Sequence, residues 1–404
     1  MKEEKITITN AQELRQEKCN VPTLRFSNKT IWEKKRIKDF CEVNPKTEEL
    51  EDEFIYIDLE SVSKGCLLSK NIISKTNAPS RAQRVLKNND ILFQCVRPYQ
   101  MNNLLFNAEN ADFQYVASTG YAQIRTQENS SFVYQLLHSS KFNKEVMLRC
   151  TGSSYPAISS SDLEDIEVYI CGVEEQQKIG YFLDLIDRRI AVQNKIISKY
   201  ETLIKGLTDC LLNKKEDNYY TFKDLYLKAG EGGTPTTDNN SYYENGTIPF
   251  IKIDDLSQKY IKRNSDYITH LGLEKSAAWL IPTNSVIFSN GATIGRISIN
   301  TYPIATKQGV LGIVPSSIVM AEYLYYYMKT TYFRRQVRRI TVKGTMDCAY
   351  LKDLNSIICH IPDINHQEKR IALLTVLDEK IACERMILQK LKEQKKYLLS
   401  KMFI

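Results

Sequence analysis

Polar and basic side chains gather on segments that the sequence predicts to be loops between short apolar strands or beside glycines. They are Arg97, Tyr99, Gln100, Ser153, Ser154 and Tyr155 in the first half of the chain, and Thr234, Asn290, Thr293, Arg296, Lys307, Gln308, Lys343 and Thr345 in the second. Side chains of these types can hydrogen-bond to base edges in a groove of DNA or hold phosphates. For any one of them, simple exposure to water is an equally good explanation.

A dense group of cations follows the tyrosine-rich segment EYLYYYMKTTYF. Its members are Arg334, Arg335, Arg338, Arg339 and Lys343. A run of charges usually marks the solvated face of a helix, but this run ends at a loop that already carries hydrogen-bonding side chains. The pattern favours contact with phosphates, for which Arg335, Arg339 and Lys343 are the expected side chains. The tyrosines are expected in a core or an interface.

No combination of residues predicts catalysis. An adenine-N6 methyltransferase would carry Asp or Asn before Pro-Pro and an aromatic residue, and the chain has no Pro-Pro pair. The glycine segments 229–233 and 291–295 lack the following helix, or the Lys-Ser/Thr, that a phosphate-binding loop needs. The histidines, at positions 138, 270, 360 and 366, form no H-x-x-x-H pair and support no Ser-His-Asp triad. We expect no catalytic residue, no bound cofactor and no metal in this chain.

The composition is that of a globular protein. The 404 residues leave room for two or three domains, and the net charge of +7 permits a nucleic-acid partner without requiring one. Ten cysteines without C-x-x-C spacing indicate reduced thiols rather than a zinc site or disulfides. The sequence shows no signal-peptide core and no run of about 18 apolar residues. We therefore expect a soluble, cytoplasmic protein with no membrane contact.

Two segments with heptad spacing of apolar residues repeat one another. Residues 173–212 and 366–403 each predict a long helix, and aligning them places Asp187 on Asp378. A single such helix usually indicates a core or dimerisation helix, whereas the repeat predicts two tandem halves, each a globular unit followed by its helix. The expected seam consists of Leu183, Ile186, Ile190, Ile197 and Leu207 on the first helix and Leu374, Leu377, Ile381, Leu388 and Leu398 on the second.

The globular units correspond as well. Segments 90–93 and 285–288 predict matching strands that lead into polar loops, and helical stretches are predicted at about 131–150 and 321–340, each ending at a glycine loop. The predicted fold class is α+β, occurring twice. The predicted domains are an N-terminal arm at 1–30, globular units at 31–172 and 216–362, and spacer helices at 173–215 and 363–404.

Several short motifs, in this order, resemble the specificity subunits of type I restriction-modification systems. They are Gly232–Pro235, Ile248–Ile251, Gly291–Arg296, Lys307–Gly309 and the closing Ile361-Pro362 with His366–Glu368. The first half shows Val96–Tyr99 and Glu175-Gln176 in corresponding places, but has Asn44-Pro45-Lys46 where the second has Gly-Gly-Thr-Pro. The resemblance covers nearly the whole chain after the arm.

This resemblance implies a non-catalytic subunit. It implies two target-recognition domains that each read one half of a bipartite, asymmetric site in double-stranded DNA, joined by two antiparallel helices with pseudo-twofold symmetry. Gln193 and Glu384 occupy the same repeat position near mid-helix and are expected close to that axis. Two adenine-N6 methyltransferase subunits and the restriction subunits would be the partners. S-adenosylmethionine, ATP and Mg would be bound by those partners.

An alternative class remains open from the residues alone. A coiled-coil scaffold or adaptor could use two β-rich heads to bind protein or glycan. A salt titration of duplex-DNA binding separates the two classes, because a DNA reader loses affinity steeply as salt rises and a scaffold has no such binding to lose. A stand-alone nuclease or methyltransferase is disfavoured by the missing motifs.

Overall fold

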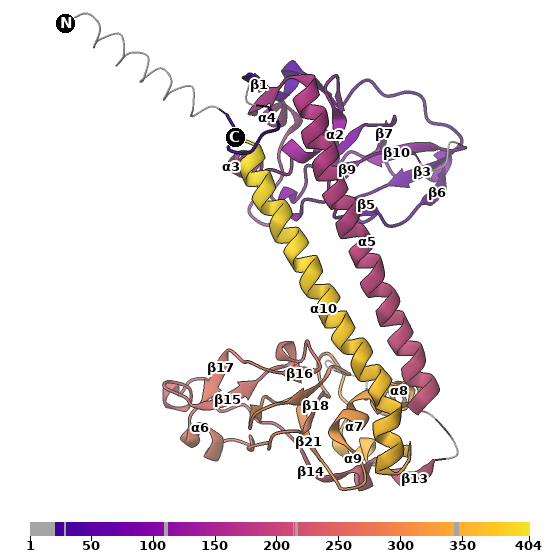
Figure 1. Cartoon of the computed structure of the whole chain (residues 1–404), viewed down its shortest axis with the longest axis vertical. Coiled ribbons are helices and arrows are strands. Elements are labelled where there is room, and N and C mark those ends of the chain that lie inside the picture. Colours follow the sequence, from indigo (N-terminus) through magenta and orange to yellow (C-terminus); the bar gives the residue numbers. More distant parts are fainter. Residues whose placement is uncertain (1–20, 28–29, 109–111, 213, 215–216, 343–346) are drawn as a thin grey trace, which may run out of the picture. The chain divides into compact units, whose positions relative to one another are not determined.

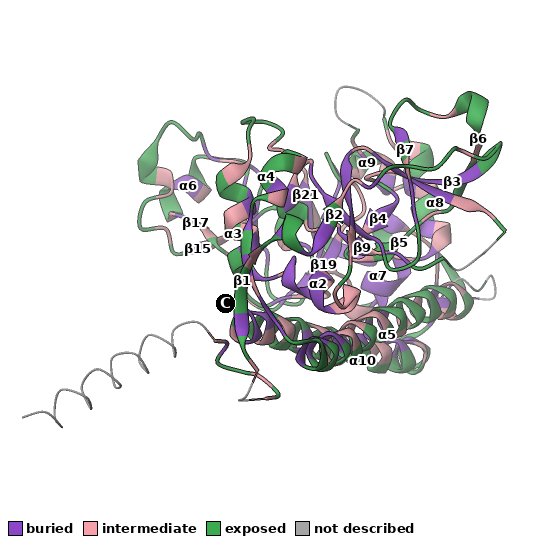
Figure 2. Cartoon of the chain, turned by 90° about the horizontal axis from the view of Figure 1, so that it is seen from above, coloured by how far each residue is buried: buried purple, intermediate pink, exposed green. Residues whose placement is uncertain are grey.

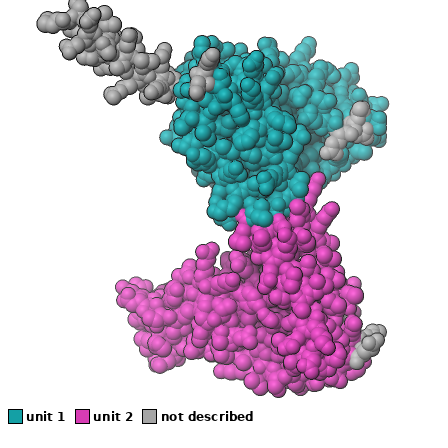
Figure 3. Space-filling model, in the orientation of Figure 1, with its two compact units in different colours: residues 1–194, 387–404 teal, residues 195–386 magenta. Residues whose placement is uncertain are grey.

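The computed structural model describes residues 21–27, 30–108, 112–212, 214, 217–342 and 347–404. The chain divides into two compact units (Figure 3). Unit 1 comprises the chain up to Asn194 together with Ile387–Ile404, and unit 2 comprises Lys195–Met386. The two long helices in Figure 1, α5 (Val173–Leu212) and α10 (Ile364–Met402), each contribute one segment to both units. Most of the predicted arm at 1–30 lies outside the described residues.

Unit 1 is built on two four-stranded sheets, with strand orders β2-β11-β8-β9 and β6-β3-β10-β7. Two short pairs, β1-β12 and β4-β5, accompany them. All four residues of β8 are buried, as expected for a strand covered on both faces. The strands are β1 (Trp32–Arg36), β2 (Cys41–Val43), β3 (Glu53–Ile57), β4 (Val62–Ser63), β5 (Cys66–Leu67), β6 (Asn71–Ser74), β7 (Ala82–Val85), β8 (Ile91–Gln94), β9 (Leu104–Leu105), β10 (Gln114–Ser118), β11 (Tyr121–Thr126) and β12 (Glu167–Cys171).

Unit 2 repeats this plan with a five-stranded sheet, β14-β21-β18-β19-β16, a three-stranded sheet, β17-β15-β20, and the pair β13-β22. Strand β18 is buried along its whole length, like β8 in unit 1. The strands are β13 (Asn218–Thr221), β14 (Tyr226–Glu231), β15 (Ile248–Ile251), β16 (Tyr260–Ile261), β17 (Asp266–Ile268), β18 (Val286–Ser289), β19 (Ile297–Asn300), β20 (Ala305–Thr306), β21 (Val310–Pro315) and β22 (Ile358–Ile361).

Each helical stretch predicted as one segment is two helices. Residues 131–150 form α2 (Ser130–Leu136) and α3 (Ser140–Arg149), and residues 321–340 form α7 (Ala321–Tyr327) and α8 (Thr331–Ile340). Each stretch divides because a hydroxyl caps the start of its second helix. Ser139 Oγ accepts from Phe142 N at 3.3 Å, and Thr330 Oγ1 accepts from Phe333 N at 3.2 Å. Short helices α4 (Ser160–Glu164), α6 (His270–Glu274) and α9 (Leu351–Leu354) complete the units.

A buried glutamine fixes the start of each long helix in the same way. Gln176 and Gln367 are fully buried. Gln176 Nε2 donates to Cys171 O at 2.7 Å and its Oε1 accepts from Asn129 N at 3.1 Å. Gln367 Nε2 donates to Pro362 O at 2.8 Å and its Oε1 accepts from Met320 N at 2.9 Å. The repeat seen in the sequence therefore extends to buried hydrogen bonds.

Both long helices carry a buried stripe beside exposed residues (Figure 2). All ten expected seam residues are buried or half-buried, and so are Gln193 and Glu384. Within unit 1, Leu399, Met402 and Phe403 share a core with Leu183, and Lys395 Nζ lies 2.6 Å from Asp187 Oδ1. Within unit 2, Leu374 and Leu212 share a core, and Arg385 pairs with Glu201 at 2.6 Å. None of the described helices has the length and apolar composition needed to cross a lipid bilayer.

Candidate nucleic-acid interface

In unit 1, the loop after β8 lies beside the loop after α3. An isolated antiparallel bridge joins Val96 to Ala157, and a second joins Ala157 to Thr151. Ile158 N donates to Cys95 O at 3.1 Å, which continues this pairing towards the end of β8. These backbone contacts bring together two loops that lie far apart in the sequence.

All six residues predicted to contact DNA in unit 1 lie on this pair of loops. Arg97 N donates to Pro156 O at 2.8 Å, and its guanidinium carbon lies 4.4 Å from the centre of the Tyr155 ring. Ser153 and Ser154 are exposed at the tip of the second loop, next to Gly152, whose φ of +90° suits a residue without a side chain. The remaining two, Tyr99 and Gln100, are also exposed.

Unit 2 builds the same pair of loops. Isolated bridges join Gly291 to Cys348 and Cys348 to Val342, and Ala349 N donates to Asn290 O at 2.8 Å. The predicted contact residue Asn290 is fully buried, so the structure places it beneath the loops rather than on their surface. Lys343 and Thr345, which were predicted to lie on the second loop, fall outside the described residues.

The other predicted residues of unit 2 differ in their exposure. Thr293, Lys307 and Gln308 are exposed. Arg296 Nη1 donates to Asp254 Oδ1 at 3.0 Å, so this cation is already paired with a carboxylate. Thr234 is half-buried, and its hydroxyl has no hydrogen-bond partner among the described residues.

Close packing explains why the two residues before Thr234 are glycines. A Cβ on Gly232 would lie 2.0 Å from Thr306 O, and one on Gly233 would lie 2.5 Å from Ala278 N. No larger residue fits at either position without moving the backbone. This part of the motif in unit 2 is therefore explained by close packing of the chain.

The cation run occupies the outer face of α8. Arg334, Arg335, Arg338 and Arg339 are exposed, and none forms a salt bridge with another described residue. The opposite face is buried through Phe333 and Val337. Tyrosines 323 and 325–327 on α7 are nearly or fully buried, and burial raises the pKa of each above its ordinary value. These tyrosines are core residues, as expected.

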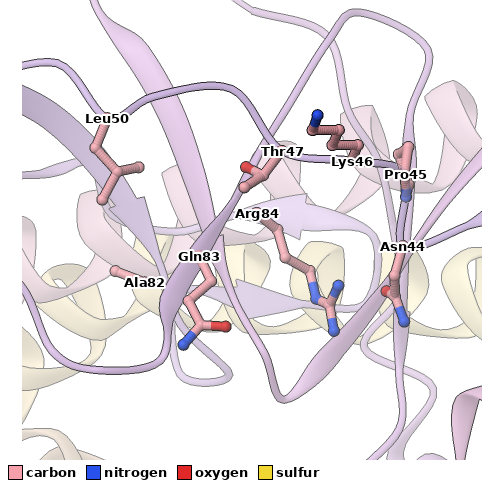
Figure 4. A pocket seen from close by; sticks show the side chains of 8 residues that line it. All are labelled: Asn44, Pro45, Lys46, Thr47, Leu50, Ala82, Gln83 and Arg84. Atoms are coloured by element: carbon pink, nitrogen blue, oxygen red, sulfur yellow. The ribbon is translucent and has the colours of Figure 1, made fainter.

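A basic pocket lies beside the second sheet of unit 1, between β7 and the segment that contains Asn44-Pro45-Lys46 (Figure 4). Arg84 extends from β7 towards Asn44, and its Nε has no hydrogen-bond partner among the described residues. Burial lowers the pKa of Arg84 below its ordinary value. Lys46, Thr47 and Gln83 also line the pocket. Within the described part of the chain, no three His, Cys, Asp or Glu side chains come close enough together to hold a metal ion.

The sequence matches the family model of the type I restriction modification DNA specificity domain twice, over residues 30–202 and 215–393. The chain belongs to this family. The two matched stretches correspond to the two halves of the repeat, so the chain holds two copies of the specificity domain.

Named relatives of this specificity-domain chain are type I restriction enzyme specificity subunits. The EcoR124I/EcoR124II subunit of Escherichia coli is 26% identical over 48% of this chain and 53% of its own length. The MjaIX subunit of Methanocaldococcus jannaschii is 26% identical over 68% of each chain. The HindI subunit of Haemophilus influenzae is 21% identical over 72% of this chain and 80% of its own. The chain thus spans about half the length of the E. coli relative.

Solved structures share the fold of this specificity-domain chain. The S subunit of the type I restriction-modification system from M. genitalium aligns with a TM-score of 0.56 at 16% identity, over 95% of this chain and 99% of that one. A chain from a study of complex assembly and conformational transition in a type I restriction-modification system aligns with a TM-score of 0.57 at 19% identity, over 92% and 97%.

Sequence reasoning missed the residues that shape the loops from below. Gln94 is buried at the end of β8, where its Nε2 donates to Gln100 Oε1 at 2.9 Å and its Oε1 accepts from Asn102 N at 3.1 Å. Ser289 holds the following loop in a similar way at the end of β18, because its Oγ accepts a hydrogen bond from Arg296 N at 2.8 Å. A polar residue that closes an otherwise apolar strand was the signal available for both.

Proposed function

We propose that this chain is the non-catalytic specificity subunit of a type I restriction-modification complex. It recognises a bipartite, asymmetric site in double-stranded DNA, with one half-site read by each unit. The observation that carries this proposal is the recurrence of one loop scaffold with unlike side chains. Because the loops of the two units carry different donors, acceptors and cations, the two half-sites have different sequences.

The two long helices provide the spacing in this proposal. They form an antiparallel coiled coil with pseudo-twofold symmetry, supported by the buried stripe on each helix and by the ion pairs that join their segments within each unit. A helix of 39 or 40 residues is about 60 Å long, which suits one to two turns of duplex DNA between the half-sites. Adding residues within 190–200 changes the spacer or prevents assembly. An unchanged spacer would contradict this role.

The chemistry of the complex belongs to partner subunits. Two adenine-N6 methyltransferase subunits bind the outer faces of the helices, which remain exposed along residues such as Val192, Leu203, Val376 and Met386. Restriction subunits join through them. S-adenosylmethionine, ATP and Mg are bound by these partners, and the specificity subunit contributes position and sequence recognition.

The proposal is tested by producing the full chain with the methyltransferase subunits of its host and sequencing the modified DNA. One split methylated motif, absent from cells without the chain, is the expected result. A salt titration of duplex-DNA binding with the full chain provides a second measurement, and affinity should fall steeply as salt rises. No new motif together with binding that is insensitive to salt would contradict the proposal.

A further inference from the structure

We propose that Arg97 reads a guanine in the half-site of unit 1, and that Tyr155 positions the Arg97 side chain for this contact. This inference rests on the proposed function and adds a base and two residues to it. It depends on four features of the described residues: the backbone of Arg97, its aromatic neighbour, its free donors and its counterpart in unit 2.

The backbone at Arg97 is held in a conformation that few residues with a side chain adopt. Its φ is 56° and its ψ is 54°, in the left-handed region, and the next residue is Pro98. The hydrogen bond to Pro156 O and the Val96–Ala157 bridge hold it there. A non-glycine residue in this region costs of the order of 1 kcal/mol, so surrounding contacts must fix it. The direction in which the side chain leaves the loop is therefore fixed as well.

The guanidinium of Arg97 lies over the Tyr155 ring, with 4.4 Å between the guanidinium carbon and the ring centre. Tyr155 is 63% exposed, so one part of this stack faces solvent. Stacking restricts a long side chain to few rotamers and leaves its N–H groups directed outwards in the guanidinium plane. Tyr155 thus orients the donors without using them.

The donors of Arg97 are unoccupied by any described residue. Among the residues that the structure describes, no carboxylate forms a salt bridge with Arg97, in contrast with Arg296 in unit 2, which donates to Asp254. A planar fork with parallel N–H groups matches two acceptors side by side. In the major groove this pattern is the O6 and N7 of guanine, which is why arginine-to-guanine is the commonest specific contact. A stacked, unpaired arginine beside exposed Ser153 and Ser154 fits that partner.

The matching position of unit 2 supports a role that belongs to the side chain rather than the scaffold. Val96 and Gly291 make equivalent bridges, so Arg97 corresponds to Ala292. Ala292 also has a positive φ, 49°, close to the 56° of Arg97. The strained backbone is therefore common to both units, whereas the guanidinium is present only in unit 1. Arg97→Ala should keep the loop intact, because the protein already places alanine in this conformation.

The test is selection of sequences by the full chain from a library of randomised duplex DNA, with the unaltered protein and with variants at these positions. Arg97→Ala should abolish the preference for guanine at one position of one half-site, a loss of roughly 5- to 150-fold in discrimination, while the rest of the motif is unchanged. Tyr155→Ala should weaken preference at that same position, and Tyr155→Phe should restore it because the ring is kept.

A matched control is Lys228→Ala, which removes a cation stacked at 4.3 Å on the Trp279 ring outside the loops. It should leave the motif unchanged. If Arg97→Ala weakens binding to all sequences equally, Arg97 is a phosphate contact and the inference is overturned. An unchanged motif overturns it too. If the unaltered chain selects no split motif, the proposed function fails, and this inference fails with it. If the unaltered chain selects a split motif but Arg97→Ala does not remove a guanine preference, only this inference fails.

Discussion

Helices α3 in unit 1 and α8 in unit 2 are the same element with different outer surfaces. Each has ten residues, each is capped by a hydroxyl, and each buries a phenylalanine and a valine at matching positions. The exposed positions that hold Arg334, Arg335, Arg338 and Arg339 in unit 2 hold Asn143, Lys144, Met147 and Leu148 in unit 1. The buried face of the element is thus kept, while the outer face holds four arginines in unit 2 and a single cation, one amide and two apolar side chains in unit 1.

The difference separates residues that build the units from residues that can distinguish them. Buried positions such as Gln176 and Gln367 make equivalent hydrogen bonds, and a change there would disturb the fold of either unit. Exposed positions are free of that constraint. In the proposed complex, unit 2 supplies more of the electrostatic attraction to DNA, and unit 1 depends more on the contacts of its two loops.

The largest expected effect comes from removing the arginines of α8. Changing all four to alanine should lower the steepness of log K against log salt by about 3 to 4, because each phosphate contact contributes about 0.9. Affinity should fall roughly 10²- to 10³-fold near physiological salt. The measurement is duplex-DNA binding by the full chain at several salt concentrations.

The matched change in unit 1 is Lys144→Ala, which removes one cation at the position of Arg335. This change should lower the steepness of log K against log salt by at most about 1. Equal effects from the two helices, or no effect from the four arginines, would break the electrostatic comparison between the units.

The next effect concerns the buried glutamine at the start of each long helix, which both units share. Gln176→Ala and Gln367→Ala should each destabilise their own unit by about 3 kcal/mol, because each change leaves buried backbone groups unpaired. The chain has two tryptophans, Trp32 in unit 1 and Trp279 in unit 2, so variants that keep one of them report unfolding of each unit separately. The exposed Gln258→Ala is the control and should have little effect. Very unequal losses would contradict a common scaffold.

A smaller effect should distinguish the units by pH. His138 lies on unit 1 where unit 2 has Lys329, and desolvation, with a smaller contribution from the charge of Lys395, lowers the pKa of His138 from 6.5 to about 4. The folded state therefore binds this proton less readily than the unfolded state. The stability of unit 1 is kept above pH 6.5 and falls as pH drops from 6.5 towards 4. The loss is about 2 kcal/mol, less than the full shift implies because the residue is only half-buried.

This loss should follow the fluorescence of Trp32 rather than that of Trp279. His138→Gln removes the titrating group and should flatten the pH dependence of unit 1 between pH 6.5 and 4. A pH profile of unit 1 that His138→Gln leaves unchanged would show that other groups cause its acid sensitivity.

Much of the fold could be predicted because it follows from local patterns of apolar and polar residues. Heptad spacing gave both long helices to within a few residues, and matching apolar segments gave β8 and β18. The division of each helical stretch was missed, although Ser139 and Thr330 are ordinary capping residues, because apolar periodicity continues across both caps. Pairing between distant loops, such as Val96 with Ala157, has no local pattern.

The candidate interface was predicted less completely, for a physical reason. Residue type and loop position indicate which side chains can form hydrogen bonds, but exposure depends on tertiary packing. Asn290 was predicted to face a partner and is buried, while Arg296 is held by Asp254, which lies far away in the sequence. The stacking of Arg97 on Tyr155 likewise joins two loops that only the folded chain brings together.

The most direct measurement of the central claim is an exchange of residues 90–160 for the corresponding segment of a relative with a different target. The exchange replaces both loops of unit 1 and leaves unit 2 intact. Selection from randomised duplex DNA by the full chain should then yield a motif with one new half-site, the original second half-site and the original spacer. A motif changed in both halves, or in neither, would contradict the assignment of one half-site to each unit.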